Sequence, residues 1–447
     1  MRLKFMDTKN NKIFLFLKKN WKYFFVFLFF FLCILLFGYN NTDNIWNYGM
    51  AHAIRIGEIP YKDFNIITTP LYPFIMSLFL LIWDEYIVFL LGQSLIGVIC
   101  YYIIDKMIGN KSIMIIPFAG FGLFYLFFPN YNFLVMLLIV LLMYLENEKS
   151  NDYLIGLVLG LLVLTKHTMG AVIVICSLIS TFKFNRMGKR IIGMIGPGVL
   201  FLLYLLITHS FNSFFNLSVM GLFDFSGHNN YKSIFIMILS ILILLYTLYR
   251  LKKDYKNPLT YYLLGSIFFV YPIVDFFHFH YLWVIFLIYV LIDIKNFKNE
   301  FYLAGIILSI FFIAFNIYIN YPIYKNSSFS DLDHFTGYLH DKVYLSEIKS
   351  VYRDYKEKDN AYMFSFTNMF YDIASNHEIT YFDIPLYGNF GYNGVDSMIN
   401  KVKDMHDVYF YVEDNPNIQY CSEIYDYIRE SSVFKYQISS FEVYYKE

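Results

Sequence analysis

The sequence predicts a mainly α-helical fold: a polytopic transmembrane helical bundle of about eleven spans, followed by a small C-terminal extracytoplasmic α/β domain. Hydrophobic residues make up 58% of the chain and charged residues 16%, whereas an ordinary soluble domain has about 25% charged residues. The apolar residues are gathered in long runs that end near Asn320, and charges become frequent from about Asn326. The formal net charge is zero, so nucleic acid, which needs a basic surface, is not an expected partner. The expected partners are the membrane, lipids and sugars.

About twelve apolar runs are candidates for membrane spans. They begin near residues 23, 70, 86, 112, 131, 152, 168, 190, 233, 258, 280 and 301. The run over residues 70–83 has about 14 residues and contains Pro73, whereas a helix that crosses the membrane needs roughly 20 apolar residues. We therefore expect this run to lie in the membrane interface or to re-enter from one side, which leaves about eleven spans.

Basic residues between the runs predict the orientation, because cytoplasmic loops are enriched in Lys and Arg. Such clusters occur at the N-terminus, in residues 183–190 and 250–256 and, more weakly, in residues 295–298. We expect a multi-pass protein of the plasma (inner) membrane, with a cytoplasmic N-terminus and an extracytoplasmic tail. Residues 1–325 would form the membrane module and residues 326–447 the outer domain.

The tail alternates between strand-like and helix-like runs. The predicted strands are residues 362–366, 379–383, 408–412 and 441–445, and the predicted helices are residues 395–405 and 418–430. This alternation is typical of a small α/β domain.

The first predicted outer loop, residues 39–70, carries the main catalytic candidate. Asp43 lies just after the point where the first span leaves the membrane. A carboxylate at that depth faces both lipid headgroups and water, so Asp43 could deprotonate a sugar hydroxyl as a general base. The structural alternative is that Asp43 caps a helix over residues 45–56, because Asp is favoured at that position.

Several features follow Asp43 in order. A predicted amphipathic helix comes first, then the motif Gly57-Glu58-Ile59-Pro60-Tyr61-Lys62-Asp63-Phe64, then an apolar run that begins with Pro70. This order resembles the large-loop membrane glycosyltransferases of the GT-C fold, which include protein O-mannosyltransferases, the lipid A aminoarabinose transferase and bacterial dolichyl-phosphate-mannose-type transferases. The resemblance covers about residues 21–185 and is weak in the tail. It implies a polyprenyl-phosphate-sugar donor, inversion at the sugar carbon and Asp43 as the catalytic base.

The chain departs from the family at two places. The family often has a second acid beside the first, and a further acid after the outer end of a later span. The corresponding residues here are Asn44 at the first place, and Asn130 and Asn132 at the second. Amides can position a substrate but cannot take up a proton, so we assign these three residues to substrate binding.

Lys166 is the candidate for contact with the donor phosphate. It follows Thr165 at the end of an apolar run and is expected on the outer face beside His167. A cation there could neutralise the phosphate as it leaves. The structural alternative is a lysine at the end of a span whose apolar stem packs along the helix while its ammonium group reaches water. The family has a Thr-Lys pair at the corresponding place, which favours donor-phosphate binding by Lys166 and His167.

A third polar cluster, also at an outer span end, contains Asp275, His278 and His280. Carboxylate and imidazole suit divalent metals, but two residues at i and i+2 share a face only in a strand. A metal is therefore a minor alternative, and no cofactor is expected. We interpret the cluster as binding a headgroup or sugar, in keeping with an Asp-x-x-His pattern of related transferases; an aromatic interfacial belt is the structural alternative.

Two further features are assigned to substrate contact. Arg55 and Glu58 would share one side of a helix, where a solvated ion pair is the default and Glu58 would be a reserve acid if the loop covers the cavity. Residues 388–394 form a turn rich in Gly and Asn that lacks the lysine of a phosphate loop, and this turn could contact an acceptor glycan.

Taken together, these residues predict a membrane glycosyltransferase that moves a sugar from a polyprenyl-phosphate donor to an extracytoplasmic glycan, lipid or protein. One alternative is a lipid-linked glycan transporter or flippase, which would place charges deep within its spans. Another is a polysaccharide polymerase or ligase, which usually has a late, arginine-rich main loop. Mid-span charges are scarce here, and the late loops lack such arginines.

Overall fold

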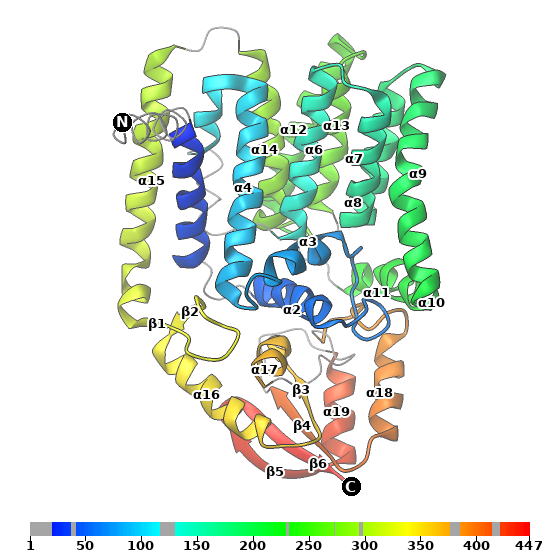
Figure 1. Cartoon of the computed structure of the whole chain (residues 1–447), viewed down its shortest axis with the longest axis vertical. Helices are drawn as coiled ribbons and strands as arrows, with labels where there is room; N and C mark the ends of the chain where they lie inside the picture. Colours follow the sequence, from blue (N-terminus) through cyan, green and yellow to red (C-terminus); the bar gives the residue numbers. More distant parts are fainter. Residues whose placement is uncertain are drawn as a thin grey trace, which may run out of the picture.

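The computed structural model describes residues 20–36, 42–116, 130–228, 232–271, 273–294, 298–375, 385–413 and 421–447. Its apolar helices form a bundle, and the C-terminal part of the chain lies against one end of that bundle (Figure 1). The 28-residue helix α15, Asn299–Asn326, runs along the bundle and leads into the C-terminal part. The fold is therefore mainly helical with a small C-terminal sheet, as the sequence predicts.

Four described helical segments are long and apolar enough to cross a membrane. They are Tyr86–Met114, Phe184–Ile207, Ile234–Lys253 and Phe276–Asp293. The first comprises α4 (Tyr86–Ile108) and the 3-10 helix η1 (Gly109–Met114), and the others are α9, α12 and α14. Shorter apolar helices complete the bundle: Asn20–Leu36, α6 (Tyr131–Asn147), α7 (Asp152–Thr165), α8 (His167–Ser180), and α13 (Pro258–Ser266) with η3 (Ile267–Val270). The chain is thus a polytopic membrane protein, and the run predicted from about residue 112 lies largely outside the described residues.

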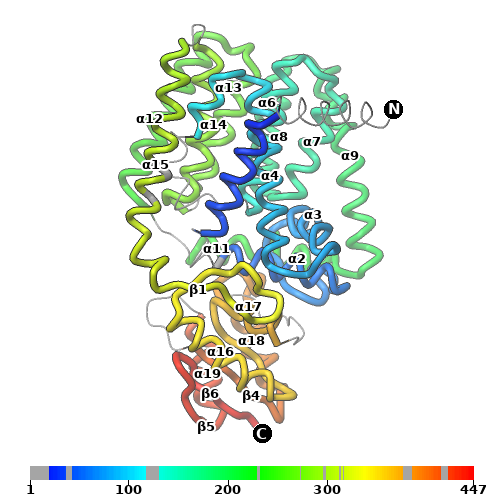
Figure 2. The backbone as a smooth tube through the Cα atoms, turned by 60° about the vertical axis from the view of Figure 1, so that its left-hand side comes forward, coloured from blue at the N-terminus to red at the C-terminus, as the bar shows by residue number. Residues whose placement is uncertain are grey.

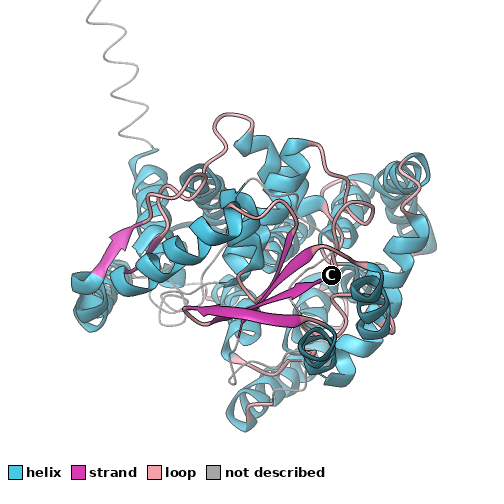
Figure 3. Cartoon of the chain, turned by 90° about the horizontal axis from the view of Figure 1, so that it is seen from below, coloured by secondary structure: helices cyan, strands magenta, loops and turns pink. Residues whose placement is uncertain are grey.

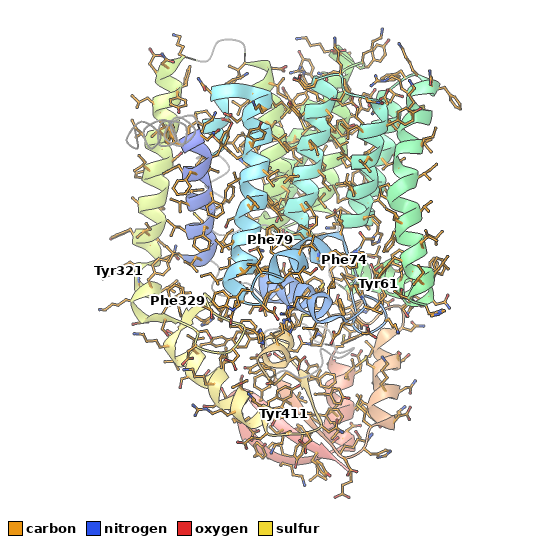
Figure 4. The ribbon with its side chains drawn as sticks, in the orientation of Figure 1. Tyr61, Phe74, Phe79, Tyr321, Phe329 and Tyr411 are labelled. Atoms are coloured by element: carbon orange, nitrogen blue, oxygen red, sulfur yellow. The ribbon has the colours of Figure 1, made fainter. Side chains whose placement is uncertain are left out.

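Two short helices lie at the end of the bundle that faces the C-terminal part (Figures 1 and 2). They are α2 (Thr42–Ile56) and α3 (Leu71–Leu80). The ten residues of α3 cover only about 15 Å, roughly half the thickness of a bilayer core. Phe74 and Phe79 of α3, and Tyr61 of the loop between α2 and α3, lie at this level between the two parts (Figure 4). The run over residues 70–83 therefore contains a helix, Leu71–Leu80, that is too short to cross the membrane.

A second short segment runs along the same end. It consists of α10 (Phe211–Phe214), the π-helical turn η2 (Phe215–Met220) and α11 (Gly221–His228). The Ser218 hydroxyl donates to the Ile66 carbonyl at 3.2 Å, which joins this segment to the loop before α3. The segment and the first loop together form the surface that the C-terminal part covers.

The C-terminal part begins with the antiparallel strands β1 (Ser327–Phe329) and β2 (Leu339–Asp341). A four-stranded sheet follows in the order β3-β4-β6-β5, seen from below in Figure 3. Its strands are β3 (Ala361–Phe364), β4 (Val408–Glu413), β5 (Val433–Ile438) and β6 (Phe441–Lys446); β3 pairs with β4 in parallel, and the other neighbours are antiparallel. The helices are α16 (Lys342–Lys356), α17 (Asn368–Ser375), α18 (Gly394–Asp404) and α19 (Ser422–Ser431).

Most predicted elements of the tail are confirmed. β3, β4 and β6 coincide with three predicted strands, and α18 and α19 with both predicted helices. The predicted strand over residues 379–383 lies outside the described residues. Strand β5 and helices α16 and α17 were not predicted. The signal for β5 was present in the sequence, because residues 434–438 alternate between apolar and polar side chains as a half-buried strand does.

The opposite end of the bundle carries the basic residues and an ion-pair network. Helix α9 runs towards α10, at the end that the C-terminal part covers, so its basic first turns lie at the far end (Figure 1). There the fully buried Arg190 donates from Nε to Asp152 at 2.9 Å and lies 2.6 Å from Glu146. It also donates to the Ser177 carbonyl at 3.0 Å. Because these partners come from α6, α7 and α8, the network ties four helices together.

Glycines allow α7 and α9 to pack in close contact. A Cβ atom at Gly156 would lie 2.1 Å from the Arg190 carbonyl oxygen, and one at Gly160 would lie 2.9 Å from the Pro197 ring. The two glycines are four residues apart and so form the small-xxx-small pattern of close helix pairs in membranes. The missing side chains are what brings α9, and with it Arg190, next to α7.

Replacing Gly156 by Leu should therefore separate α7 from α9 and lower the free energy of unfolding by about 1–3 kcal/mol, the usual cost of overpacking. The measurement is the thermal unfolding midpoint of the protein in detergent. Gly196→Leu is the matched control, because a Cβ at Gly196 of α9 meets nothing within 4 Å. Equal midpoints for the two variants would contradict the proposed close packing.

Candidate active site

Asp43 lies in the first turn of α2, where a carboxylate interacts favourably with the positive end of the helix dipole. The helix begins at Thr42, so Asp43 lies within the helix rather than before it. Its backbone carbonyl accepts a hydrogen bond from Asn47 Nδ2 at 2.6 Å. Its side chain reaches solvent, but protein surrounds the carboxylate closely enough to remove part of its hydration. The carboxylate is thus accessible at the end of the bundle that the C-terminal part covers.

Lys166 occupies the single-residue turn between α7 and α8. Its backbone is extended there (φ −153°, ψ 98°), which ends one helix and starts the next. The Lys166 ammonium donates to Asn132 Oδ1 at 2.9 Å and lies 5.4 Å from the centre of the Tyr131 ring. The first turn of α6 therefore holds the lysine in place by a hydrogen bond and a cation–π contact.

The N-terminus of α6 contributes amide groups to the same place. Asn130 caps α6 by accepting from the backbone N–H groups of Asn132 (2.9 Å) and Phe133 (3.3 Å), and its Oδ1 also accepts from Tyr281 at 3.2 Å. Among the described residues, Asn130 Nδ2 is buried without a hydrogen-bond partner. The Asn132 side chain interacts with Tyr131, and the His167 ring interacts with the Ser218 backbone. Buried polar atoms are normally satisfied, so the Asn130 amide is suited to a ligand or bound water.

Asp275 and His278 form the third side of the site. Asp275 caps α14 (Phe276–Asp293): its Oδ1 accepts from the His278 backbone N–H at 2.8 Å and lies 2.8 Å from His278 Nδ1. The pair is fixed by the cap, and both side chains are only partly exposed. An imidazole held by a carboxylate can donate or accept a proton on its other nitrogen.

These groups interact through space with Asp43. Desolvation by the surrounding protein raises the pKa of the Asp43 carboxyl, and the Asp275 carboxylate raises it further, while His278 and Lys166 oppose the shift. Desolvation likewise lowers the pKa of Lys166 to about 8, against the opposing effects of Asp275 and Asp43. The structure therefore brings together five predicted residues far apart in sequence, namely Asp43, Asn132, Lys166, Asp275 and His278, with Asn130 and His167 beside them.

Asn44 and His280 are placed differently. Asn44 is fully buried, its Nδ2 donating to Tyr86 (2.7 Å) and its Oδ1 accepting from Gln93 (2.6 Å), so it anchors α2 to α4. His280 is buried in α14 and lies about 200° around the helix from His278. Neither side chain therefore points in the same direction as its neighbour in the site.

The predicted helical pair of Arg55 and Glu58 is wrong. Helix α2 ends at Ile56, and Gly57 adopts φ +102°, so Glu58 lies beyond the helix. Arg55 instead lies 3.4 Å from Asp84, and it is twelve residues, or about 18 Å of helix, from Asp43. The two residues lie near the other end of α2 and do not join the Asp43 site.

One group of three described residues has the chemistry of a metal site: His52, Asp84 and His334, whose ligand atoms all lie within 4.8 Å of one another. Sequence reasoning missed it because the three residues come from separate segments. His52 Nδ1 lies 3.0 Å from the Asp84 carboxylate, and His334 Nδ1 lies 2.8 Å from the Asp84 carbonyl. Asp84 Oδ2 is buried without a hydrogen-bond partner among the described residues. Arg55 supplies a positive charge to the same carboxylate. We interpret the group as a polar link between α2, the loop before α4 and the C-terminal part.

The chain thus has a bundle of apolar helices with a helical first loop, an acid and a cation at one end, and an α/β part that covers that end. The chain is similar to ArnT from Cupriavidus metallidurans, an aminoarabinose transferase, whose apo crystal structure it matches with a TM-score of 0.55 and 10% sequence identity over 98% of each chain. At this identity the likeness concerns the fold. No protein-family model and no curated protein sequence matches the chain.

Proposed function

We propose that this protein is a membrane glycosyltransferase that transfers a sugar from a polyprenyl-phosphate-linked donor to an extracytoplasmic acceptor. The observation that carries the proposal is the electrostatic interaction of Asp43 with Lys166 at one end of the bundle, together with the buried Asn130 amide nitrogen, which lacks a partner among the described residues. The fold shared with ArnT, an aminoarabinose transferase, supports the same class of reaction.

In the proposed reaction, an acceptor hydroxyl attacks the anomeric carbon of the donor sugar with inversion. Asp43 takes the hydroxyl proton as the new C–O bond forms, and the bond from the anomeric carbon to the phosphate oxygen breaks. Negative charge then grows on the leaving polyprenyl phosphate. Lys166 neutralises that charge, and the amide groups of Asn130 and Asn132 and the His167 ring donate to the phosphate oxygens.

In the proposed reaction, Asp275 and His278 bind a sugar of the substrate next to Asp43. The carboxylate accepts from His278, so the imidazole can offer its remaining nitrogen to a sugar hydroxyl. No resident metal is required by this scheme, because Lys166 supplies the charge that a divalent ion would otherwise provide.

We propose that the site faces the outside of the plasma membrane, with residues 326–447 as an extracytoplasmic domain. The support is the position of the basic first turns of α9 at the end of the bundle opposite the C-terminal part, because basic residues favour the cytoplasm. A reporter fused after Lys325 should therefore be active only outside the cell. Activity of the fusion in the cytoplasm would reverse the orientation.

A transporter is a weaker interpretation of the same charges. The buried ion pairs of Arg190 join Glu146, in the last turn of α6, to Asp152, the first residue of α7, so they lie at helix ends. Transport pathways usually place such charges at mid-membrane depth. The network therefore has the features of a structural clamp.

The Asp43→Asn variant should fold normally and lose transfer by roughly 10³-fold, because the amide keeps the shape of the carboxylate but cannot accept the proton. The measurement is transfer from a polyprenyl-phosphate sugar by the purified protein. Asp333→Asn, which changes an exposed carboxylate of the C-terminal part, is the control and should retain activity. Full activity of Asp43→Asn would reject the assignment of the base.

The pH profile of kcat/KM should fall on the acid side with the protonation of Asp43 and on the alkaline side with the deprotonation of Lys166, because the pKa values of both groups are shifted. Activity falls on the acid side as Asp43 is protonated, at a pH above the usual carboxyl range because its pKa is raised, and on the alkaline side near pH 8 as Lys166 loses its charge. Lys166→Arg should move the alkaline limb to higher pH, since the guanidinium stays charged, and Lys166→Met should weaken use of the donor. Lys62→Arg, in the first loop, is the control. An alkaline limb that stays in place in Lys166→Arg would exclude Lys166 as its source.

A further inference from the structure

A second cavity lies away from Asp43, between α11 of the membrane module and the C-terminal part. Its volume is about 240 Å³; two of its lining residues come from α11 and eight from the C-terminal part. Asp224 and His228 belong to α11, and Tyr387, Asp396 and Glu423 belong to the C-terminal part. This volume is just below the roughly 300–1,000 Å³ of sites for drug-sized molecules, so it suits a small unit such as the end of a glycan.

The shape of the cavity is fixed before any ligand binds, because the turn over residues 388–394 is in close backbone contact with α11. Gly388 and Gly391 have φ +91° and +86°, values that favour glycine. A Cβ at Gly388 would lie 2.6 Å from Phe225 Cβ, so the turn can approach α11 only without a side chain. The Asn393 N–H donates to Asp224 Oδ2 at 2.8 Å, which fixes the turn to α11 from its other end. A ligand would therefore meet a formed wall and would not have to order a loop.

The lining is acidic and aromatic. Three carboxylates face the cavity, and among the described residues that line it there is no Lys or Arg. The His228 and Tyr387 rings stack with their centroids 4.0 Å apart and 13° between their planes, so an aromatic pair joins the two parts at the cavity and each ring keeps one face that the other does not cover. The Tyr387 hydroxyl donates to Glu423 at 2.8 and 2.9 Å, and carboxylates have further lone pairs for outside donors.

We infer that this cavity, formed by Asp224, His228, Tyr387, Asp396 and Glu423, binds a neutral or amine-bearing sugar of the acceptor; this inference rests on the proposed glycosyltransferase function. Sugar hydroxyls and ammonium groups donate to carboxylates, and the apolar face of a sugar ring packs on an aromatic ring face. A phosphate, sulfate or uronate would meet three like charges without a compensating cation. The cavity therefore selects against anionic acceptors.

The position of the cavity relates it to the active site. Ser218, which precedes α11 in the same segment, donates to the Ile66 carbonyl, and Asn65 beside it donates to the Asn389 carbonyl at 3.4 Å. The segments that form the cavity are thus hydrogen-bonded to the first loop, which also contains Asp43. An acceptor held here by one sugar can extend along the first loop towards the base.

The test measures sugar binding directly, with full-length protein in lipid nanodiscs and saturation-transfer NMR. The probes are three trisaccharides of matched size: neutral chitotriose, its cationic deacetylated form, and anionic trigalacturonate. Wild type should bind the neutral and cationic probes and not the anionic one. Binding of trigalacturonate with equal affinity, or no binding of any probe, would overturn the inference.

The decisive variant is Asp396→Lys, which reverses one exposed charge in the first turn of α18. It should weaken the cationic probe by about tenfold and change the neutral probe much less, because charge reversal acts on charged ligands. Asp404→Lys, an exposed change at the end of the same helix and outside the cavity, is the matched control. Equal effects of the two variants would place binding elsewhere.

Tyr387→Ala removes one ring of the stacked pair and should weaken the neutral and cationic probes alike. An unchanged affinity would exclude the cavity as the binding site. Because binding is read without catalysis, the probes should bind Asp43→Asn as they bind wild type. If the probes do not bind, the assignment of Asp43 as the base is unaffected. If Asp43→Asn proves fully active, the sugar-binding result is unaffected.

Discussion

The packing of α2 between the bundle and the C-terminal part is the constraint on which the proposed site depends. On one side, Asn44 is bonded to Tyr86 and Gln93 of α4. On the other, Gly49 approaches α17 so closely that a Cβ would lie 2.3 Å from the Met369 sulfur. A helix held on both faces cannot rotate without breaking buried hydrogen bonds, so Asp43 in its first turn has a fixed direction. The contacts that position the carboxylate are therefore some distance from it, and a change at Gly49 would act on Asp43 through the whole helix.

The shifted pKa values follow from the same arrangement. Water is partly excluded where the C-terminal part covers the bundle, so charged forms lose solvation and the pKa of Asp43 rises while that of Lys166 falls to about 8. Both groups then titrate closer to neutrality than in water. A base of this kind is stronger once ionised, and a cation of this kind attracts a phosphate more strongly than it would in water. The enclosure that costs solvation free energy is also what makes the pair chemically useful.

The sequence could predict what depends on local pattern and on the order of features along the chain. Apolar runs identified the helices of the bundle, and the position of Asp43 after the first span identified a candidate base. It could not predict which distant side chains meet, because the contact between Lys166 and Asn132 is made by packing α6 beside the turn between α7 and α8. Arg55 and Glu58 were paired by a helical spacing that ends at Gly57. The sequence did carry a signal for this helix end, because Gly57 follows the last helical residue and Pro60 comes three residues later. The group of His52, Asp84 and His334 was missed for the same reason as the Lys166–Asn132 contact. Its members come from three separate segments, and the sequence does not show that these segments meet.

The C-terminal part contributes residues both to the support of α2, which carries Asp43, and to the second cavity. It contributes Met369 to the packing of α2, His334 to the polar link at Asp84, and Tyr387, Asp396 and Glu423 to the second cavity. The two sites differ in charge: Lys166 lies with the Asp43 and Asp275 carboxylates at the first, whereas the described lining of the second cavity has three carboxylates and no Lys or Arg. If a lipid phosphate is attracted to the first and repelled by the second, donor and acceptor are sorted by electrostatics before any specific contact is made. An anionic donor then has one favourable place to bind, and an acceptor without negative charge can occupy the other without competition.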